Sequence, residues 1–214
     1  MTEKLNPKAY QGRVKPQFHY VPMNLLPGIA DCLKDSDAYD RSNADLINES
    51  LLLIIDWFQN SNNGQSIDNN NLNKVVRNCI LVATGHRDFR LVENNTCKYM
   101  PNFHLIPRNG LRLVSEVFKH GSEKYGVFNW RIDAIHLSDY FNAMMRHALA
   151  INAGEFRDPD SGIEHAAHIA AGAMIIMDAA IHGKAIDDRP GAKTQAYQKP
   201  NLAESLGECY QVIA

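Results

Sequence analysis

The chain has 214 residues and a mass of 24.0 kDa, which suits one ordinary domain or two very small ones and excludes a large multidomain assembly. Hydrophobic residues make up 45% and charged residues 21%, so there is enough apolar material for a core and no case for global disorder. The formal net charge is -2, and the chain therefore lacks the basic excess of a nonspecific nucleic-acid binder.

Cysteine usage and the first residues indicate the cellular compartment. The cysteines lie far apart without a CxxC pair, and the N-terminal residues lack the apolar core of a signal peptide, so we expect free thiols and a cytoplasmic location. The longest strongly apolar stretch, 169–181, contains Asp178 and falls well short of the roughly 20 residues that span a bilayer. We therefore expect no membrane helix. The cysteines are Cys32, Cys79, Cys97 and Cys209.

Apolar residues at helical spacing predict three helices in the first half of the chain, beginning only after Pro22. The run 59–71 is rich in Asn, Ser and Gly and is predicted to be a loop. Pro101, Pro107 and the pair Asn109–Gly110 are expected to close this half. The predicted helices cover 25–33, 44–58 and 72–84.

The second half shows a clearer helical pattern. Ser138 or Asp139 is expected to cap a helix that Gly154 ends, and 158–162 reads as a turn. From residue 187 the tail is polar and receives no predicted structure. The predicted helices cover 111–125, 139–153 and 163–182, and the fold class is therefore all-α, a helical bundle.

The two halves resemble each other. KPQFHYVPMNLLPGIADC and MPNFHLIPRNGLRLVSEV share Pro, Phe-His and a second Pro at an offset of 85, and each precedes a helix. A Gly-Gln-x-x-Asp run from Gly64 to Asp68 stands 90 residues before a Gly-Glu-x-x-Asp run from Gly154. The alternative is chance similarity between helix-turn segments.

A true repeat would make the bundle two related helix-helix-loop-helix halves. The first half would then be degenerate, because Gln65 replaces a carboxylate and the histidines of the last helix have no counterpart near residues 73–77. The predicted organisation is a degenerate half with an N-terminal arm over 1–98, a more complete half over 99–186, and a polar tail over 187–214.

Carboxylates and imidazoles are concentrated around the turn of the second half. Glu155 and Asp158 stand three residues apart, and His165 and His168 face the same side of the next helix at i and i+3. This density is typical of a divalent-cation site. In the alternative interpretation the acids only form the turn and the histidines pack in a small-residue interface.

The block HGSEKYGVFNWR, which Glu116 precedes, has the composition of a nucleotide-binding segment. Lys124 and Arg131 bracket aromatic residues and Asn129, which supplies cations for phosphates, an amide for polar recognition and rings for stacking. In the alternative, Trp130 is core and Arg131 pairs with a nearby acid. Arg146, beside His147, either pairs with a carboxylate or meets a phosphate, and the pair is the commoner arrangement.

Several catalytic motifs are absent from the sequence. There is no GxxxxGK[ST], so a P-loop kinase is excluded, and the HRD at 86–88 lacks a Gly-rich loop and a DFG. Neither HExxH nor GxSxG occurs, and no His-Asp dipeptide is present, which argues against an HD-type phosphohydrolase.

With these blocks in order, the second half resembles a phage family of dATP/dGTP diphosphohydrolases (N-terminal domain), similar to the MazG-like all-α nucleoside triphosphate pyrophosphohydrolases. The likeness runs from about Phe103 to Asp178 and rests on HLIPRNGLRLVSEVFKHGSEKYGVFNWR and RHALAINAGEFRDPDSGIEHAAHIAAGAM. The resemblance implies that 99–186 is a catalytic half. It implies cleavage of a deoxynucleoside triphosphate, dGTP or dATP being favoured, to the monophosphate and pyrophosphate with Mg²⁺ or Mn²⁺, in phage nucleotide-pool metabolism.

The resemblance also implies site residues. Better-known MazG-like enzymes bind metal through an ExxE and an ExxD pair on two helices, whereas the second half has no ExxE and its one ExxD lies in the turn. Glu116, Glu155 and Asp158 are implied as catalytic and metal-site residues, with His165 and His168 as further metal ligands. The implied substrate-binding residues are Lys124, Asn129, Trp130, Arg131, Arg146 and His147.

The alternative is a noncatalytic helical phage protein that has kept the fold and binds a nucleotide or another protein. The partner expected for the enzyme is a small-molecule nucleotide substrate, and we expect no membrane and no direct nucleic-acid binding. The pairing of helix faces in this class favours a homodimer or an internal pseudo-dimer of the two halves, and the sequence leaves both open.

Overall fold

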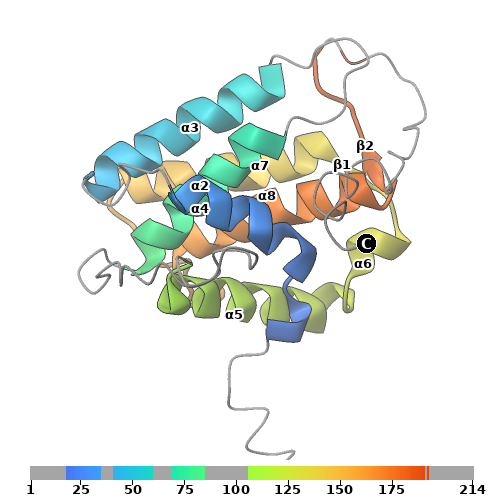
Figure 1. Cartoon of the computed structure of the whole chain (residues 1–214), viewed down its shortest axis with the longest axis horizontal. Coiled ribbons are helices and arrows are strands. Elements are labelled where there is room, and N and C mark those ends of the chain that lie inside the picture. Colours follow the sequence, from blue (N-terminus) through green and yellow to red (C-terminus); the bar gives the residue numbers. More distant parts are fainter. Residues whose placement is uncertain (1–17, 35–40, 60–68, 85–105, 191, 193–214) are drawn as a thin grey trace, which may run out of the picture.

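The computed structural model describes residues 18–34, 41–59, 69–84, 106–190 and 192, and it confirms the predicted all-α bundle (Figure 1). The first half contains η1 (Phe18–Tyr20), η2 (Met23–Leu25), α2 (Leu26–Lys34), α3 (Asn43–Gln59) and α4 (Asn69–Thr84). The second half contains α5 (Arg108–Tyr125), α6 (Asn129–Ile132), α7 (Leu137–Asn152) and α8 (His165–Ile181). Two short strands, β1 (Ile135–His136) and β2 (Ala185–Ile186), pair in parallel.

Helices α4 and α8 lie at the centre of the bundle. They pack against each other, α3 covers α4, α7 covers α8, and α5 contacts both central helices (Figure 1). The sequence of α8 is apolar around nearly the whole helix, which is the pattern of a helix surrounded by other helices. Its small residues allow close packing, and a Cβ at Gly172 would lie 3.0 Å from Cγ of Met144 on α7.

One hydrophobic core contains residues of both predicted halves. Leu46 and Ile80 from the first half and Leu137 and Met174 from the second are fully buried members of it. The predicted boundaries at 98 and 186 stay a prediction. The run 64–68, Cys97, Cys209 and the tail from 193 lie outside the described residues, whereas Cys32 and Cys79 carry the predicted free thiols.

The start of α7 differs from the prediction. The helix begins at Leu137, and its N-cap residue, His136, makes no side-chain capping hydrogen bond. Instead Asp188 accepts a hydrogen bond from the backbone N–H of Ser138 at 2.9 Å. The prediction that Ser138 or Asp139 caps this helix was therefore wrong, because the β1–β2 pairing brings a capping carboxylate from 50 residues further along the chain.

The Asn109–Gly110 pair does not close the first half. Both residues lie inside α5, which starts directly after Pro107. A Cβ at Gly110 would lie 2.5 Å from the carbonyl oxygen of Ile80 on α4. The glycine is therefore needed for the close approach of α5 to α4 rather than for a turn.

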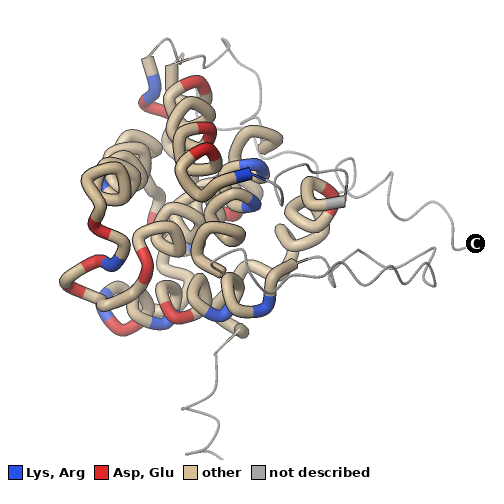
Figure 2. The backbone as a smooth tube through the Cα atoms, turned by 90° about the vertical axis from the view of Figure 1, so that its left-hand side faces the viewer, with Lys and Arg blue, Asp and Glu red and all other residues tan. Residues whose placement is uncertain are grey.

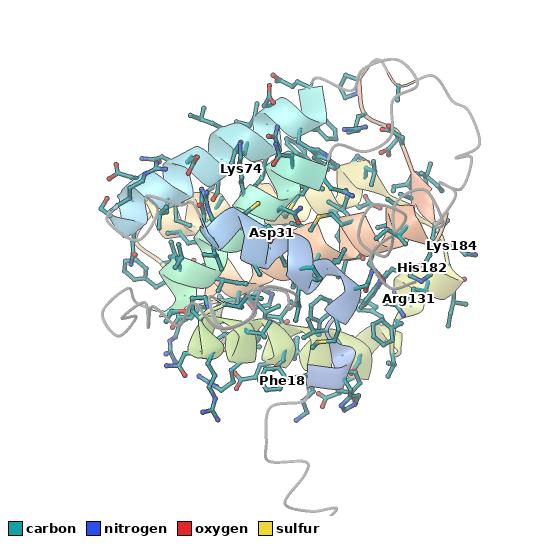
Figure 3. All side chains as sticks on the ribbon, viewed as in Figure 1. Phe18, Asp31, Lys74, Arg131, His182 and Lys184 are labelled. Atoms are coloured by element: carbon teal, nitrogen blue, oxygen red, sulfur yellow. The ribbon has the colours of Figure 1, made fainter. Side chains whose placement is uncertain are left out.

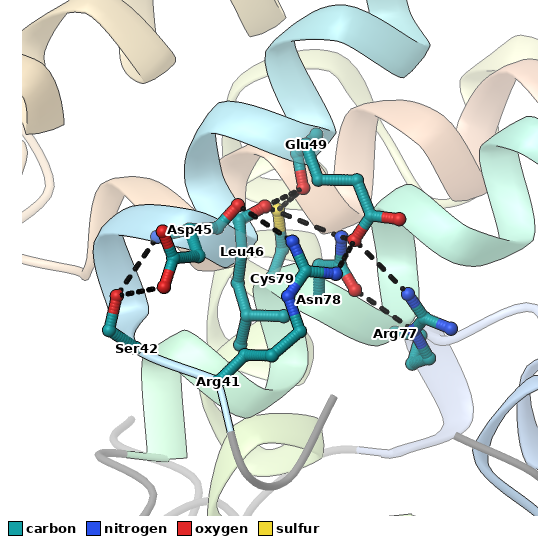
Figure 4. Close-up of polar contacts among 9 residues, drawn as sticks. Arg41, Ser42, Asp45, Leu46, Glu49, Arg77, Asn78 and Cys79 are labelled. Atoms are coloured by element: carbon teal, nitrogen blue, oxygen red, sulfur yellow. Dashed lines mark hydrogen bonds and ion pairs between the residues drawn. The ribbon is translucent and has the colours of Figure 1, made fainter. Parts of the chain in front are cut away.

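A polar cluster ties α3 to α4 in the first half (Figure 4). Oε2 of Glu49 accepts hydrogen bonds from Arg41 at 2.7 Å, from Asn78 at 2.8 Å and from Arg77 at 3.3 Å. Asn78 is fully buried and Arg77 nearly so. Buried polar groups at this helix pair are thus satisfied by one carboxylate, which fixes the orientation of the two helices.

Charged residues of both signs are interspersed along the tube in the view of Figure 2. Some form pairs one helical turn apart, such as Lys119 with Glu123 on α5. In the described parts of the chain, no helix has the length and apolar composition needed to cross a bilayer.

Candidate functional site

A cavity of about 720 Å³ lies between α5, α6, α7 and α8. Lys124 from α5 and Asn129 from α6 line it, as do Arg146 and His147 from α7, and Asp158 from the loop before α8. Several of the residues predicted from the sequence to form the site line this cavity. Helix α8 also lines it, through Ala171, Gly172 and Ile175.

Three histidines meet at one end of this cavity. Nδ1 of His147 on α7 lies 2.8 Å from Nδ1 of His165 on α8. The ring of His147 also stacks on that of His168, with centroids 4.6 Å apart and planes at 19°. The predicted i, i+3 relationship of His165 and His168 therefore holds, and both turn toward α7.

The loop before α8 brings Asp158 to the same place. Its Oδ2 accepts hydrogen bonds from the backbone N–H of Ser161 at 2.9 Å and from the Ser161 hydroxyl at 2.8 Å. The Ser161 hydroxyl lies 2.8 Å from Nε2 of His168. Gly162 has φ +68°, a backbone conformation that favours glycine and allows this tight turn.

The protonation states at the site follow from burial and neighbours. Burial lowers the pKa of His147 to about 4, with further lowering by His168 and His165, so this imidazole is neutral at neutral pH. Burial also lowers the pKa of His168. For Asp158, burial acts to raise the pKa, but the hydrogen bonds from Ser161 outweigh it and lower the pKa, so the group is a carboxylate.

His147, Asp158 and His165 each offer a ligand atom, and these atoms lie within 4.8 Å of one another. Nε2 of His165 is buried and has no hydrogen-bond partner among the described residues. Glu155 is exposed, and its Oε2 lies 3.8 Å from this nitrogen. Two imidazoles and a carboxylate at this spacing can hold a divalent metal ion.

Glu116 lies outside the lining of the cavity. It forms an ion pair with Arg112, one turn earlier on α5. His120, one turn later on the same face, does line the cavity. Glu116 therefore stands beside the site rather than within the histidine cluster.

The residues predicted to bind substrate divide into two groups. Lys124, Asn129, Trp130, Arg146 and His147 line the cavity. Nζ of Lys124 lies 2.6 Å from Oδ2 of Asp160, another lining residue. Arg146 is exposed and forms no ion pair with a residue that the structure describes.

Arg131, in contrast, faces a buried carboxylate at the same end of the molecule as His182 (Figure 3). Its guanidinium donates two hydrogen bonds to Asp178 and lies over the Phe128 ring, 4.1 Å from its centroid. Trp130 is nearly buried and donates its indole N–H to the same carboxylate at 2.8 Å. The structure thus shows the alternative in which this arginine pairs with an acid.

Comparison with known proteins finds a similarity in this region. Residues 93–189 match the family model described as dATP/dGTP diphosphohydrolase, N-terminal. This part of the chain is similar to that family. The matched range contains every site residue predicted above, from Glu116 to His168.

A curated relative gives the same family name. It is the "dATP/dGTP diphosphohydrolase" of Salmonella phage PMBT28, which is 32% identical over 88 residues. The match covers 38% of this chain and 30% of the relative, so the chain spans less than a third of the relative's length. No solved structure matches the chain.

Two acids that shape the site could have been predicted from the sequence but were not. Asp160 was predicted only as part of a turn, yet it lines the cavity and pairs with Lys124. Asp178 was used only as an argument against a membrane helix. A single carboxylate in an otherwise apolar helix is itself a signal of a buried ion pair, because buried acids are rarely left unpaired.

Proposed function

We propose that the protein hydrolyses a deoxynucleoside triphosphate, with dGTP or dATP favoured, to the monophosphate and pyrophosphate. The observation that carries this proposal is one cavity that is lined both by the cations Lys124 and Arg146 and by His147 and Asp158 of the histidine cluster. The family match supports nucleotide hydrolysis as the class of reaction.

A divalent metal ion forms part of the proposal. The residues that would hold it are His147, His165 and Asp158, with Glu155 at the edge. The orphaned, buried Nε2 of His165 and the convergence of the three donor groups support the fit. When bound, such an ion lowers the pKa of a coordinated water and neutralises negative charge on phosphate oxygens.

The chain's own residues would bind and orient the nucleotide. Arg146 and Lys124 reach the cavity with cationic groups suited to phosphate oxygens. Asn129 offers an amide to the edge of the base, and Trp130, whose N–H is already donated to Asp178, contributes only its ring to the wall. Arg131 acts as a positioning residue, because its guanidinium holds α6 against α8.

The proposed reaction is in-line attack of water on the α-phosphorus. The new bond joins the water oxygen to the α-phosphorus, and the bond from that phosphorus to the bridging oxygen breaks. Pyrophosphate leaves with the electron pair of that bond, and the proton of the water passes to solvent. Lys124 and Arg146 would hold the leaving group in line.

Pyrophosphate release tests this proposal. The full chain is incubated with a panel of deoxynucleoside triphosphates in Mg²⁺, Mn²⁺ or EDTA, and wild type is compared with Glu155→Gln. We expect metal-dependent release that Glu155→Gln abolishes while the fold, followed by circular dichroism, is retained. Glu123→Gln is the matched control, because Glu123 is exposed on α5 outside the cavity lining.

Two results would contradict the proposal. A fully active Glu155→Gln variant would show that the carboxylate of Glu155 is not needed for the reaction. No release from any nucleotide by the folded protein would favour the noncatalytic binding protein, which would show thermal stabilisation by a nucleotide without product. Light scattering of the same samples tests the prediction of a homodimer against a monomeric pseudo-dimer.

A further inference from the structure

We propose that His147, His165 and Asp158 form a site for a first-row transition-metal ion, such as Mn²⁺, Fe²⁺, Co²⁺ or Zn²⁺, and that this site discriminates against Mg²⁺. The inference deepens the proposed function and rests on it only in treating this cavity as the active site. It concerns which ion the donor set selects.

The chemistry of the donors favours a transition metal. Mg²⁺ requires near-octahedral coordination by oxygen atoms, whereas imidazole nitrogens suit first-row transition metals. Of the groups that converge here, two are imidazoles and one is a carboxylate. The other predicted carboxylate on α5, Glu116, is paired with Arg112 outside the cavity lining.

The two imidazoles present the same ring atom to each other. The Nδ1 atoms of His147 and His165 lie 2.8 Å apart. Two nitrogens that bind one ion at about 2.1 Å each would stand roughly 3.0 to 3.4 Å apart, so a small opening of this pair would admit an ion.

The carboxylate of Glu155 lies near His165, where an acid that orients a metal-binding histidine would be expected. A histidine that ligates through one nitrogen usually donates its other ring N–H to a carboxylate. Nε2 of His165 is buried without a partner among the described residues, and the nearest recorded acid is Glu155, 3.8 Å away. Ligation at Nδ1 would leave a proton on Nε2, which could then donate toward this acid.

Asp158 is oriented in a similar way. The Ser161 hydroxyl bridges its Oδ2 and Nε2 of His168 at 2.8 Å on each side. One oxygen of the carboxylate is thereby held in place by the loop. His168 is then a positioning residue for Asp158, although the sequence predicted it as a ligand.

Metal binding by the metal-free full chain tests the proposal without an activity measurement. Mn²⁺, Co²⁺, Zn²⁺ and Mg²⁺ are titrated separately by calorimetry, and Co²⁺ is also followed by its visible d–d absorption. We expect one Co²⁺ per chain and a Mg²⁺ affinity weaker by at least about 100-fold, because two of the three donors are imidazole nitrogens and Mg²⁺ prefers oxygen ligands.

Three variants locate the site. His147→Gln and Asp158→Asn should each weaken Co²⁺ binding by more than about 100-fold. His19→Gln, at an exposed histidine in η1, should leave it unchanged and is the matched control. His147 is only half-buried, so its variant remains informative if one at the buried His165 fails to fold.

Two outcomes would overturn the metal assignment, namely Mg²⁺ binding as tight as Co²⁺ binding, or Co²⁺ binding that His147→Gln leaves intact. Failure of the metal assignment can be distinguished from failure of the proposed function. Co²⁺ binding at these residues without pyrophosphate release would support the metal site and contradict the proposed diphosphohydrolase activity. Pyrophosphate release together with Co²⁺ binding that His147→Gln does not change would contradict the metal site and support the proposed activity.

Discussion

Arg131 donates hydrogen bonds to the buried carboxylate of Asp178 from Nε at 2.6 Å and from Nη2 at 3.0 Å. Trp130 donates to the same group, and Asn24 of η2 adds a longer contact at 3.4 Å. One carboxylate on α8 therefore fixes the short helix α6, which forms a wall of the cavity, and connects it to the first half of the chain.

This relationship predicts a large loss of stability in Asp178→Ala. The substitution leaves the guanidinium of Arg131 and the indole N–H of Trp130 without their acceptor, and breaking a buried pair costs about 3 to 5 kcal/mol. Urea denaturation measures the change. Glu123→Ala, which breaks only an exposed pair with Lys119, should cost less than about 1 kcal/mol. Equal effects would mean that Asp178 is not a structural centre.

The ion pair of Lys124 with Asp160 predicts a gain in nucleotide affinity when the acid is removed. Asp160 occupies the ammonium group and adds negative charge where phosphates would bind. Asp160→Asn should lower KM for the nucleotide by a few-fold, and Lys124→Ala should raise it. Because both side chains are exposed, the effects should shrink in high salt. Steady-state kinetics at two ionic strengths checks this, and a higher KM in Asp160→Asn would contradict it.

The Glu49 cluster predicts a pH-dependent stability. Burial acts to raise the pKa of Glu49, but the hydrogen bond from Asn78 and the charges of Arg77 and Arg41 outweigh it and lower the pKa. The folded protein thus binds a proton at this group less readily than the unfolded chain. Its contribution is fully present above the unfolded pKa, near 4.5, and is lost as pH falls through the lower folded value.

Urea denaturation at pH 7, 5 and 3 measures this contribution. Glu49→Gln should cost about 1 to 2 kcal/mol at pH 7, less than a fully buried charged hydrogen bond because the side chain is 29% exposed. The difference between wild type and variant should shrink between pH 5 and pH 3. A constant difference across this range would show that ionisation of Glu49 does not stabilise the fold.

Two glycines of α5 predict opposite effects of alanine. A Cβ at Gly110 would lie 2.5 Å from the Ile80 carbonyl oxygen, so Gly110→Ala should destabilise by about 1 to 3 kcal/mol through overpacking. At Gly121 no atom lies within 4 Å of the added Cβ, and Gly121→Ala should stabilise by about 0.5 to 1 kcal/mol through helix propensity. Thermal unfolding of the pair checks the signs, and destabilisation by both would contradict the packing argument.

Local patterns were sufficient for the main elements of the fold. Apolar spacing predicted α3 as 44–58, and the helix covers Asn43–Gln59. It predicted 163–182 for α8, and the helix covers His165–Ile181. Such patterns report on which face of a helix is buried, so they locate helices without knowledge of the neighbours. The cap of α7 could not be predicted, because Asp188 reaches it only through the strand pairing.

The all-α class, the blocks that resemble the family and the shared face of His165 and His168 could be predicted from the chain, since each depends on residues close together in it. Two contacts could not be predicted in this way: His147 of α7 meets His165, and Arg131 pairs with Asp178 instead of lining the cavity. These relationships depend on how α6 and α7 dock on α8, and contacts between separate helices are set by packing of the whole core rather than by spacing along one segment.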